Sequence, residues 1–75
     1  MKIGESKTSV FKRLAANRTN NVIKNIRLLG NLSNRHNYSY SEDEFKRIFG
    51  IIEEEVKLAK SRFMVTLSKK KKFRL

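Results

Sequence analysis

Apolar residues in the first part of the chain recur at helical spacing from Phe11 to Leu29. At about 100° per residue, this spacing places the apolar side chains on one face of an α-helix. Most basic and polar residues between them fall on other faces, whereas Arg18 lies on the apolar face. The pattern predicts an amphipathic helix over about residues 9–29. Its apolar stripe consists of Phe11, Leu14, Ala15, Val22, Ile26 and Leu29.

Short signals mark the two ends of this helix. Thr8 or Ser9 can accept a hydrogen bond from a free amide of the first turn, so we expect the helix to begin there. Gly30 follows the last apolar position, where glycine easily adopts the left-handed conformation that caps a helix. Residues 1–7 have no apolar periodicity and are predicted to form a flexible arm.

A second apolar stripe starts at Phe45 and has a stronger start signal. Ser41 and Glu44 have the spacing of a capping box, in which each side chain bonds the backbone amide of the other residue. Tyr40 and Phe45 flank this box and can form a hydrophobic staple. The pattern predicts a helix over about residues 42–64, whose acidic first turn suits the helix dipole. Its stripe consists of Phe45, Ile48, Phe49, Ile52, Val56, Ala59 and Phe63.

The connection between the two stripes is long enough for the second helix to return alongside the first. We therefore predict an all-α fold, an antiparallel helical hairpin within a two-helix domain at residues 8–67. Ile23, Leu28, Ile51 and Leu58 lie off the main stripes and widen the apolar surface beyond what two helices can cover. Our hypothesis is that two hairpins dimerise into a four-helix bundle, which would cover this surface.

The size and composition of the chain make self-association a reasonable source of stability. The chain has 75 residues and no cysteine, so neither disulfides nor thiolate metal sites can supplement a small core. A domain of this size buries only about 60% of the surface that its unfolded chain exposes. No apolar run approaches the roughly 20 residues of a membrane span, and the amino terminus lacks an apolar signal-peptide core. We expect a cytoplasmic protein.

Charge is abundant and segregated along the chain. The net charge is +11, from 18 Lys and Arg against 7 Asp and Glu. Residues 1–41 carry eight bases and one acid, residues 42–55 two bases and six acids, and residues 56–75 eight bases and no acid. So basic a balance favours a polyanionic partner. The final segment, SKKKKFRL at 68–75, is predicted to be a basic tail that is disordered until it meets a partner.

No constellation of residues indicates catalysis. His36 lies in the connection, and we interpret it as a polar loop residue, because a triad would also need an orienting acid and an oxyanion site. Glu53, Glu54 and Glu55 are consecutive and point about 100° apart, which favours a solvated face or salt bridges over a metal site. The glycines are isolated, so no phosphate loop exists. We expect a protein that is not an enzyme and that has no cofactor or metal.

Arg18 is a candidate for a specific contact, because a charge on an apolar stripe costs stability unless it is paired or reaches solvent. The favoured interpretation is a salt bridge across the hairpin to one of Glu53, Glu54 or Glu55. An arginine that reaches solvent along the helix surface and an arginine that contacts a ligand are the alternatives.

Two surfaces are candidates for binding a partner. On the first helix, Lys and Arg can neutralise phosphates while interleaved Asn side chains can bond adenine edges. In the connection, Asn and Ser at positions 31–38 can hold turns, and the same segment could recognise a partner through tyrosine stacking and directional hydrogen bonds. With the basic tail, the candidate residues for binding nucleic acid or another partner are Lys12, Arg13, Lys24, Arg27, Asn31, Asn34, Arg35, Asn37, Tyr38, Lys69, Lys70, Lys71, Lys72 and Arg74.

Four short motifs occur between Ala15 and Phe63. They are Asn-Arg-Thr-Asn at 17–20, Leu-Gly-Asn-x-Ser-Asn at 29–34, Asn-Tyr-x-Tyr-Ser/Thr at 37–41 and an acidic helix start at 42–44. In these motifs the chain resembles a family of small bacterial proteins of no known activity that is associated with plasmids, phages and other mobile elements. The resemblance implies a mobile-element-encoded protein with a defined loop, and it assigns no catalytic residue.

These observations predict a small, basic, non-enzymatic nucleic-acid-binding accessory protein whose partner is DNA or RNA. A complete helix-turn-helix is not expected, because the connection is far longer than the three or four residues of that motif. The alternative is a protein-binding regulator, an inhibitor or adaptor, that acts through the 31–38 loop and the helix faces. A basic amphipathic helix on an anionic membrane surface is a third interpretation.

Overall fold

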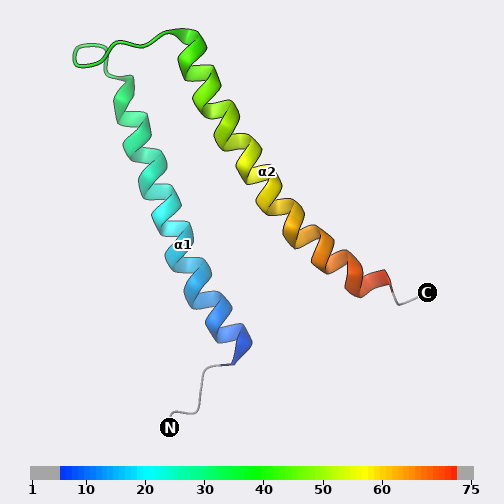
Figure 1. The fold of residues 1–75 in the computed structure, drawn as a ribbon. Coiled ribbons are helices and arrows are strands. Elements are labelled where there is room, and N and C mark those ends of the chain that lie inside the picture. Colours follow the sequence, from blue (N-terminus) through cyan, green and yellow to red (C-terminus); the bar gives the residue numbers. More distant parts are fainter. Residues whose placement is uncertain (1–5, 73–75) are drawn as a thin grey trace. The chain divides into compact units, whose positions relative to one another are not determined.

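The described part of the chain is helical throughout, apart from the connection. The computed structural model describes the backbone of residues 6–72 and the side chains of residues 6–68. It contains α1 at Lys7–Gly30, the short 3₁₀ helix η1 at Asn31–Ser33 and α2 at Glu42–Lys72 (Figure 1). No strand occurs within these residues. The prediction of an all-α fold with two helices is confirmed.

The chain divides into two units, residues 1–39 and residues 40–75. The first is built around α1 and η1 and includes most of the connection, whereas the second is built around α2. The antiparallel hairpin and its dimer concern relations between helices and stay predictions.

Ser6 begins the first helix. Its backbone is extended, with φ −71° and ψ 164°, and its hydroxyl oxygen accepts a hydrogen bond from the Ser9 amide at 3.0 Å. The predicted start at Thr8 or Ser9 is therefore wrong, because the amide of Ser9 is the group that is capped. Lys7, assigned to the flexible arm, is already helical. Residues 1–5 of that arm lie outside the described residues.

The end of α1 also differs from the expectation. Gly30 is right-handed, with φ −60° and ψ −29°, and the predicted left-handed cap is wrong. The chain tightens into η1 instead, and the Asn31 amide is directed at the carbonyls of Arg27, Leu28 and Leu29. A 3₁₀ turn thus serves the last carbonyls of the helix, which is a common way to satisfy them.

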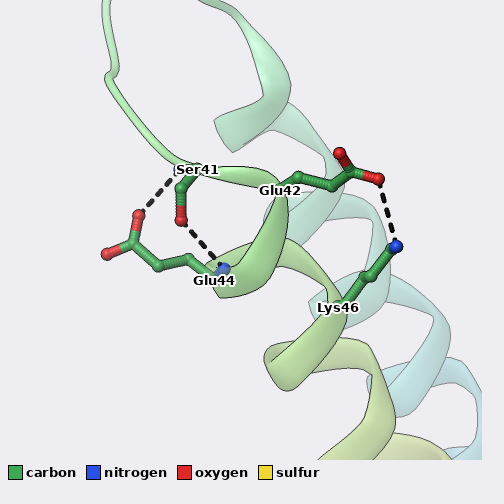
Figure 2. Close-up of polar contacts among 4 residues, drawn as sticks. All are labelled: Ser41, Glu42, Glu44 and Lys46. Carbon is green, nitrogen blue, oxygen red and sulfur yellow. Dashed lines mark hydrogen bonds and ion pairs between the residues drawn. The ribbon is translucent and has the colours of Figure 1, made fainter.

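The start of α2 is built as predicted. The Ser41 amide donates to Glu44 Oε1 at 2.8 Å, and the Glu44 amide donates to Ser41 Oγ at 3.1 Å (Figure 2). Glu42 and Lys46 add an exposed ion pair of 3.1 Å one turn apart. These contacts confirm the capping box, whereas the staple between Tyr40 and Phe45 stays a prediction.

The end of α2 lies well beyond the predicted boundary at 64, because the helix continues to Lys72. No glycine or proline follows Gly50, so the sequence contains nothing that would stop the helix. Basic residues at a helix carboxyl end also favour its dipole. Residues 68–72 of the tail that was predicted to be disordered are thus helical, and residues 73–75 lie outside the described residues.

Within each unit, the apolar stripe is covered only in part by neighbouring side chains of its own helix. Among the residues with described side chains none is buried, and Leu14, Ala15, Leu29, Phe49 and Ile52 are half-buried. The rings of Phe45 and Phe49 meet edge to face, with centroids 5.5 Å apart. Each unit is therefore an amphipathic helix whose apolar face still exposes large side chains.

Candidate nucleic-acid interface

The face of α1 opposite its apolar stripe carries a regular line of basic and carboxamide side chains. The line alternates steps of four and three residues, which keeps its members on one face of a helix. We call it the basic face, and it consists of Arg13, Asn17, Asn20, Lys24 and Arg27 of α1, with Asn31 at the start of η1. From Arg13 to Arg27 it extends over roughly 21 Å at about 1.5 Å per residue.

An open hollow lies at the carboxyl-terminal end of the basic face. Ile23 and Leu28 expose 41% and 54% of their surface there, so the hollow combines two cations and two carboxamides with an apolar lining. Sequence reasoning assigned these two residues to helix packing and missed their place beside the cations. The lining residues are Asn20, Ile23, Lys24, Arg27, Leu28 and Asn31.

All charged residues of the segment that carries the basic face are Lys or Arg. From Ser6 to Ser41 the chain contains seven Lys and Arg residues and no Asp or Glu. Lys24 and Arg27 lie one turn apart and are both exposed. The described part of this unit therefore contains no carboxylate that could neutralise them, and their positive charge favours an external anion.

Not every predicted base of the first helix belongs to this face. Arg13, Lys24 and Arg27 share it, whereas Lys12 precedes Arg13 and lies about 100° round the helix. Arg18 lies on the apolar side of α1, away from the basic face. Its predicted salt bridge to the acids of α2 stays a prediction.

The loop after α1 is organised by Asn34. Its side-chain oxygen accepts the His36 amide at 2.9 Å, and its carbonyl accepts the amides of Asn37 and Tyr38 at 3.2 and 3.0 Å. Its own amide donates to the Asn31 carbonyl at 3.5 Å. These bonds confirm, for Asn34, the interpretation that loop asparagines hold turns. Asn34 is therefore committed to the loop backbone, although it was also a candidate contact residue.

Two large side chains project from this loop. Tyr38 exposes 48% of its surface and Leu32 exposes 46%. Sequence reasoning named Tyr38 and missed Leu32, whose only signal is an apolar side chain within a polar segment. Arg35 and Asn37 are exposed in the same loop. The structure thus places an apolar, an aromatic and a basic side chain on one short segment.

The predicted basic tail is only partly described. Lys69, Lys70, Lys71 and Lys72 continue the helical backbone of α2, and Arg74 lies outside the described residues. Within the described part of the chain, no group of three or more His, Cys, Asp or Glu residues could hold a metal ion. In that same part, neither helix is both long and apolar enough to cross a membrane.

No protein-family model matches the chain, and no curated protein or solved structure matches it either. The resemblance to small mobile-element proteins therefore stays a prediction from the four motifs. The function has to be inferred from the residues and their geometry.

Proposed function

We propose that this protein is a small, non-enzymatic accessory protein that binds nucleic acid through the basic face of α1. The observation that carries this proposal is the alignment of cations and carboxamides along one helix face, in a segment from Ser6 to Ser41 that lacks any acid. Cations on such a face neutralise phosphates and release condensed counterions, which supplies most of the affinity of non-specific binding.

The dimensions of α1 favour duplex DNA over duplex RNA. A helix with its side chains is about 10–12 Å across, and the B-DNA major groove is about 12 Å wide. The major groove of A-form RNA is too deep and narrow to admit side chains to the bases. In the DNA groove, Lys24 and Arg27 would contact phosphates while Asn20 would approach base edges. Residues 31–38 and the basic end of α2 would add contacts outside the groove.

Fluorescence anisotropy with a labelled DNA duplex, at 50 to 200 mM salt, tests the proposal. Removing two phosphate contacts with Lys24→Gln and Arg27→Gln should reduce the slope of log affinity against log salt by about 1.8. The matched control is Arg47→Gln with Lys57→Gln, which removes the same charge from α2. No binding at 50 mM salt, or an equal loss in the control, would contradict the proposal. The same measurement with duplex RNA decides between the two nucleic acids.

We further propose that α1 and α2 pack as an antiparallel hairpin and that two chains pair into a four-helix bundle. The support is that both helices expose large apolar side chains along one face. Arg18 lies twelve residues before Gly30, and Glu54 lies twelve residues after Glu42, so an antiparallel arrangement would bring the two charges to similar heights. Such a pairing would offset the cost of a charge on the apolar stripe of α1.

A second candidate function is regulation of a protein partner through the loop, as an inhibitor or adaptor. It is favoured by the exposure of Leu32 and Tyr38 on a segment that Asn34 holds in a defined turn. Exposed aromatic anchors on a rigid element are typical of protein interfaces. Under this proposal, Leu32→Ser with Tyr38→Ser should abolish capture of a partner, whereas Lys24→Gln with Arg27→Gln should leave it intact.

A further inference from the structure

A regular seam of six apolar residues and a threonine follows α2 for three heptads. Its members alternate steps of four and three residues, and this spacing is the signature of a coiled coil. The seam consists of Phe45, Phe49, Ile52, Val56, Ala59, Phe63 and Thr66. Within its own unit the seam is open: Phe45, Val56 and Phe63 each expose about half of their surface.

The residues that flank the seam carry paired charges of opposite sign. On one side Glu53 is followed seven residues later by Lys60, and on the other side Glu55 is followed seven residues later by Arg62. In a coiled coil these flanking positions choose the partner and its orientation. Lys46 lies seven residues before Glu53 and pairs with Glu42 of its own helix. Because Glu53 precedes Lys60 and Glu55 precedes Arg62, one copy of α2 complements another copy that runs in the opposite direction.

We propose that α2 pairs with α2 of a second copy of this chain as an antiparallel coiled coil centred between Lys57 and Leu58. In this register Glu53 faces Lys60 of the partner subunit, and Glu55 faces Arg62 of the partner subunit. The twofold symmetry repeats both contacts, so four ion pairs border the seam. The proposal specifies the surface of the two-chain pairing proposed above and does not depend on nucleic-acid binding.

The sizes of the seam residues favour the same orientation. The antiparallel register sets Phe49 opposite Thr66 of the partner subunit and Ile52 opposite Phe63 of the partner subunit. Each phenylalanine of these layers therefore meets a smaller side chain, which fills a core evenly. A parallel pair would instead set each residue against its own copy, so that phenylalanine layers would be crowded and the Ala59 layer would be underfilled.

Charge also disfavours the parallel alternative. A parallel pair would keep Glu55 near Lys60 of the partner subunit, but it would place Glu53 and Arg62 opposite the apolar Ile48 and Leu67. It would also align the acidic stretch at 42–55 with its own copy. Antiparallel pairing sets that stretch, with six acids and two bases, over the basic residues that follow it.

A second copy, and not α1, is the occupant that this seam fits. The first unit has no acid between Ser6 and Ser41, so α1 can complement the glutamates beside the seam but not Lys60 and Arg62. α2 also carries a separate line of apolar residues about 140° round the helix, which is available for packing against another helix. That line consists of Ile51, Leu58 and Val65, each with at least half of its surface exposed.

Sedimentation equilibrium of the full chain without nucleic acid, between 1 and 200 µM, tests the proposal. We expect the wild type to reach twice the chain mass. Glu53→Lys with Arg62→Glu keeps the net charge, makes all four antiparallel pairs repulsive and leaves the Glu55–Lys60 pair of a parallel dimer untouched. We expect it to raise the dissociation constant of the dimer at least about tenfold. The matched control, Asp43→Lys with Arg47→Glu, makes the same exchange away from the seam and should dimerise like the wild type.

In a second experiment, two variants that are each expected to be monomeric are mixed, and their association into a dimer is measured. A chain with Glu53→Lys and Glu55→Lys should be monomeric alone, and so should a chain with Lys60→Glu and Arg62→Glu. Their equimolar mixture should form a dimer, because all four bordering pairs become attractive again.

A monomeric wild type at 200 µM, or a Glu53→Lys, Arg62→Glu variant that dimerises like its control, would overturn the proposal. These experiments contain no nucleic acid, so a failure of the protein to bind DNA would not change their results. The proposal of DNA binding and the proposal of the α2 pair can therefore be refuted independently.

Discussion

α1 and α2 are both amphipathic helices with basic residues, but they arrange their charges in different ways. Between Ser6 and Ser41 the first unit has bases only, and they form a line opposite the apolar stripe. α2 begins with an acidic turn, and acids and bases then alternate beside its seam. Charges of one sign call for an external anion, whereas complementary charges on one helix are satisfied by a copy of that helix. On this comparison we propose nucleic-acid binding for α1 and self-association for α2.

The largest expected effect comes from a charge placed in the middle of the seam. Ile52→Glu would bury an unpaired carboxylate in the dimer, at a cost of several kcal/mol. We expect sedimentation equilibrium to show a monomer and the midpoint of thermal unfolding to fall. The substitution leaves every residue of the basic face unchanged. The control Ser61→Glu adds the same charge to an exposed position of α2 outside both apolar lines. If the Ile52→Glu variant still dimerises, the seam of α2 does not mediate self-association.

The second expected effect is on DNA affinity. Lys24→Glu with Arg27→Glu reverses two charges of the basic face and should weaken binding to a DNA duplex at least about a hundredfold at 50 mM salt. The dimer mass should not change, because neither residue belongs to the seam. If this variant binds DNA normally but fails to dimerise, α1 mediates self-association and not DNA binding, which would contradict the comparison.

The two helix starts provide the third test. Ser41 takes part in a reciprocal box with Glu44, whereas Ser6 accepts the Ser9 amide without an acidic partner. Ser41→Ala should lower the free energy of unfolding by about 1 kcal/mol, and Ser6→Ala should lower it by less than Ser41→Ala. Urea unfolding followed by circular dichroism at one fixed protein concentration measures both values. Equal losses would show that the box adds nothing to a single cap.

The helices could be predicted because their signals are local. The period of the apolar stripes and the pairing of Ser41 with Glu44 depend on neighbouring residues only. The start of α1 was misplaced because Ser6, Thr8 and Ser9 can all accept a capping bond, and only the backbone conformation decides which one does. The end of α2 differs from the prediction because a low-complexity basic segment is typical of a disordered tail, whereas no stop signal follows Gly50 and the helix continues through the lysines.

The candidate site could be predicted in its chemistry but only partly in its geometry. The distribution of Lys and Arg along the sequence indicated a basic surface on the first helix. The exclusion of Lys12 from the basic face, and the place of Ile23 beside Lys24, require the register of the helix. The sequence could not show that Asn34, and not Asn31 or Asn37, organises the loop, because this role depends on the path of the turn.

The smallest expected effect concerns the junction between α1 and the loop. Gly30 has a right-handed backbone, and a Cβ built on it would meet nothing within 4 Å. Gly30→Ala should therefore stabilise the protein by a few tenths to about 1 kcal/mol, because alanine loses less backbone entropy on folding. Gly50→Ala is a matched control within α2, where a Cβ also meets nothing within 4 Å. In urea unfolding the two changes should have the same sign. A destabilising Gly30→Ala beside a stabilising Gly50→Ala would indicate a left-handed glycine at the end of α1, and the helix would then stop at Gly30 without continuing into η1.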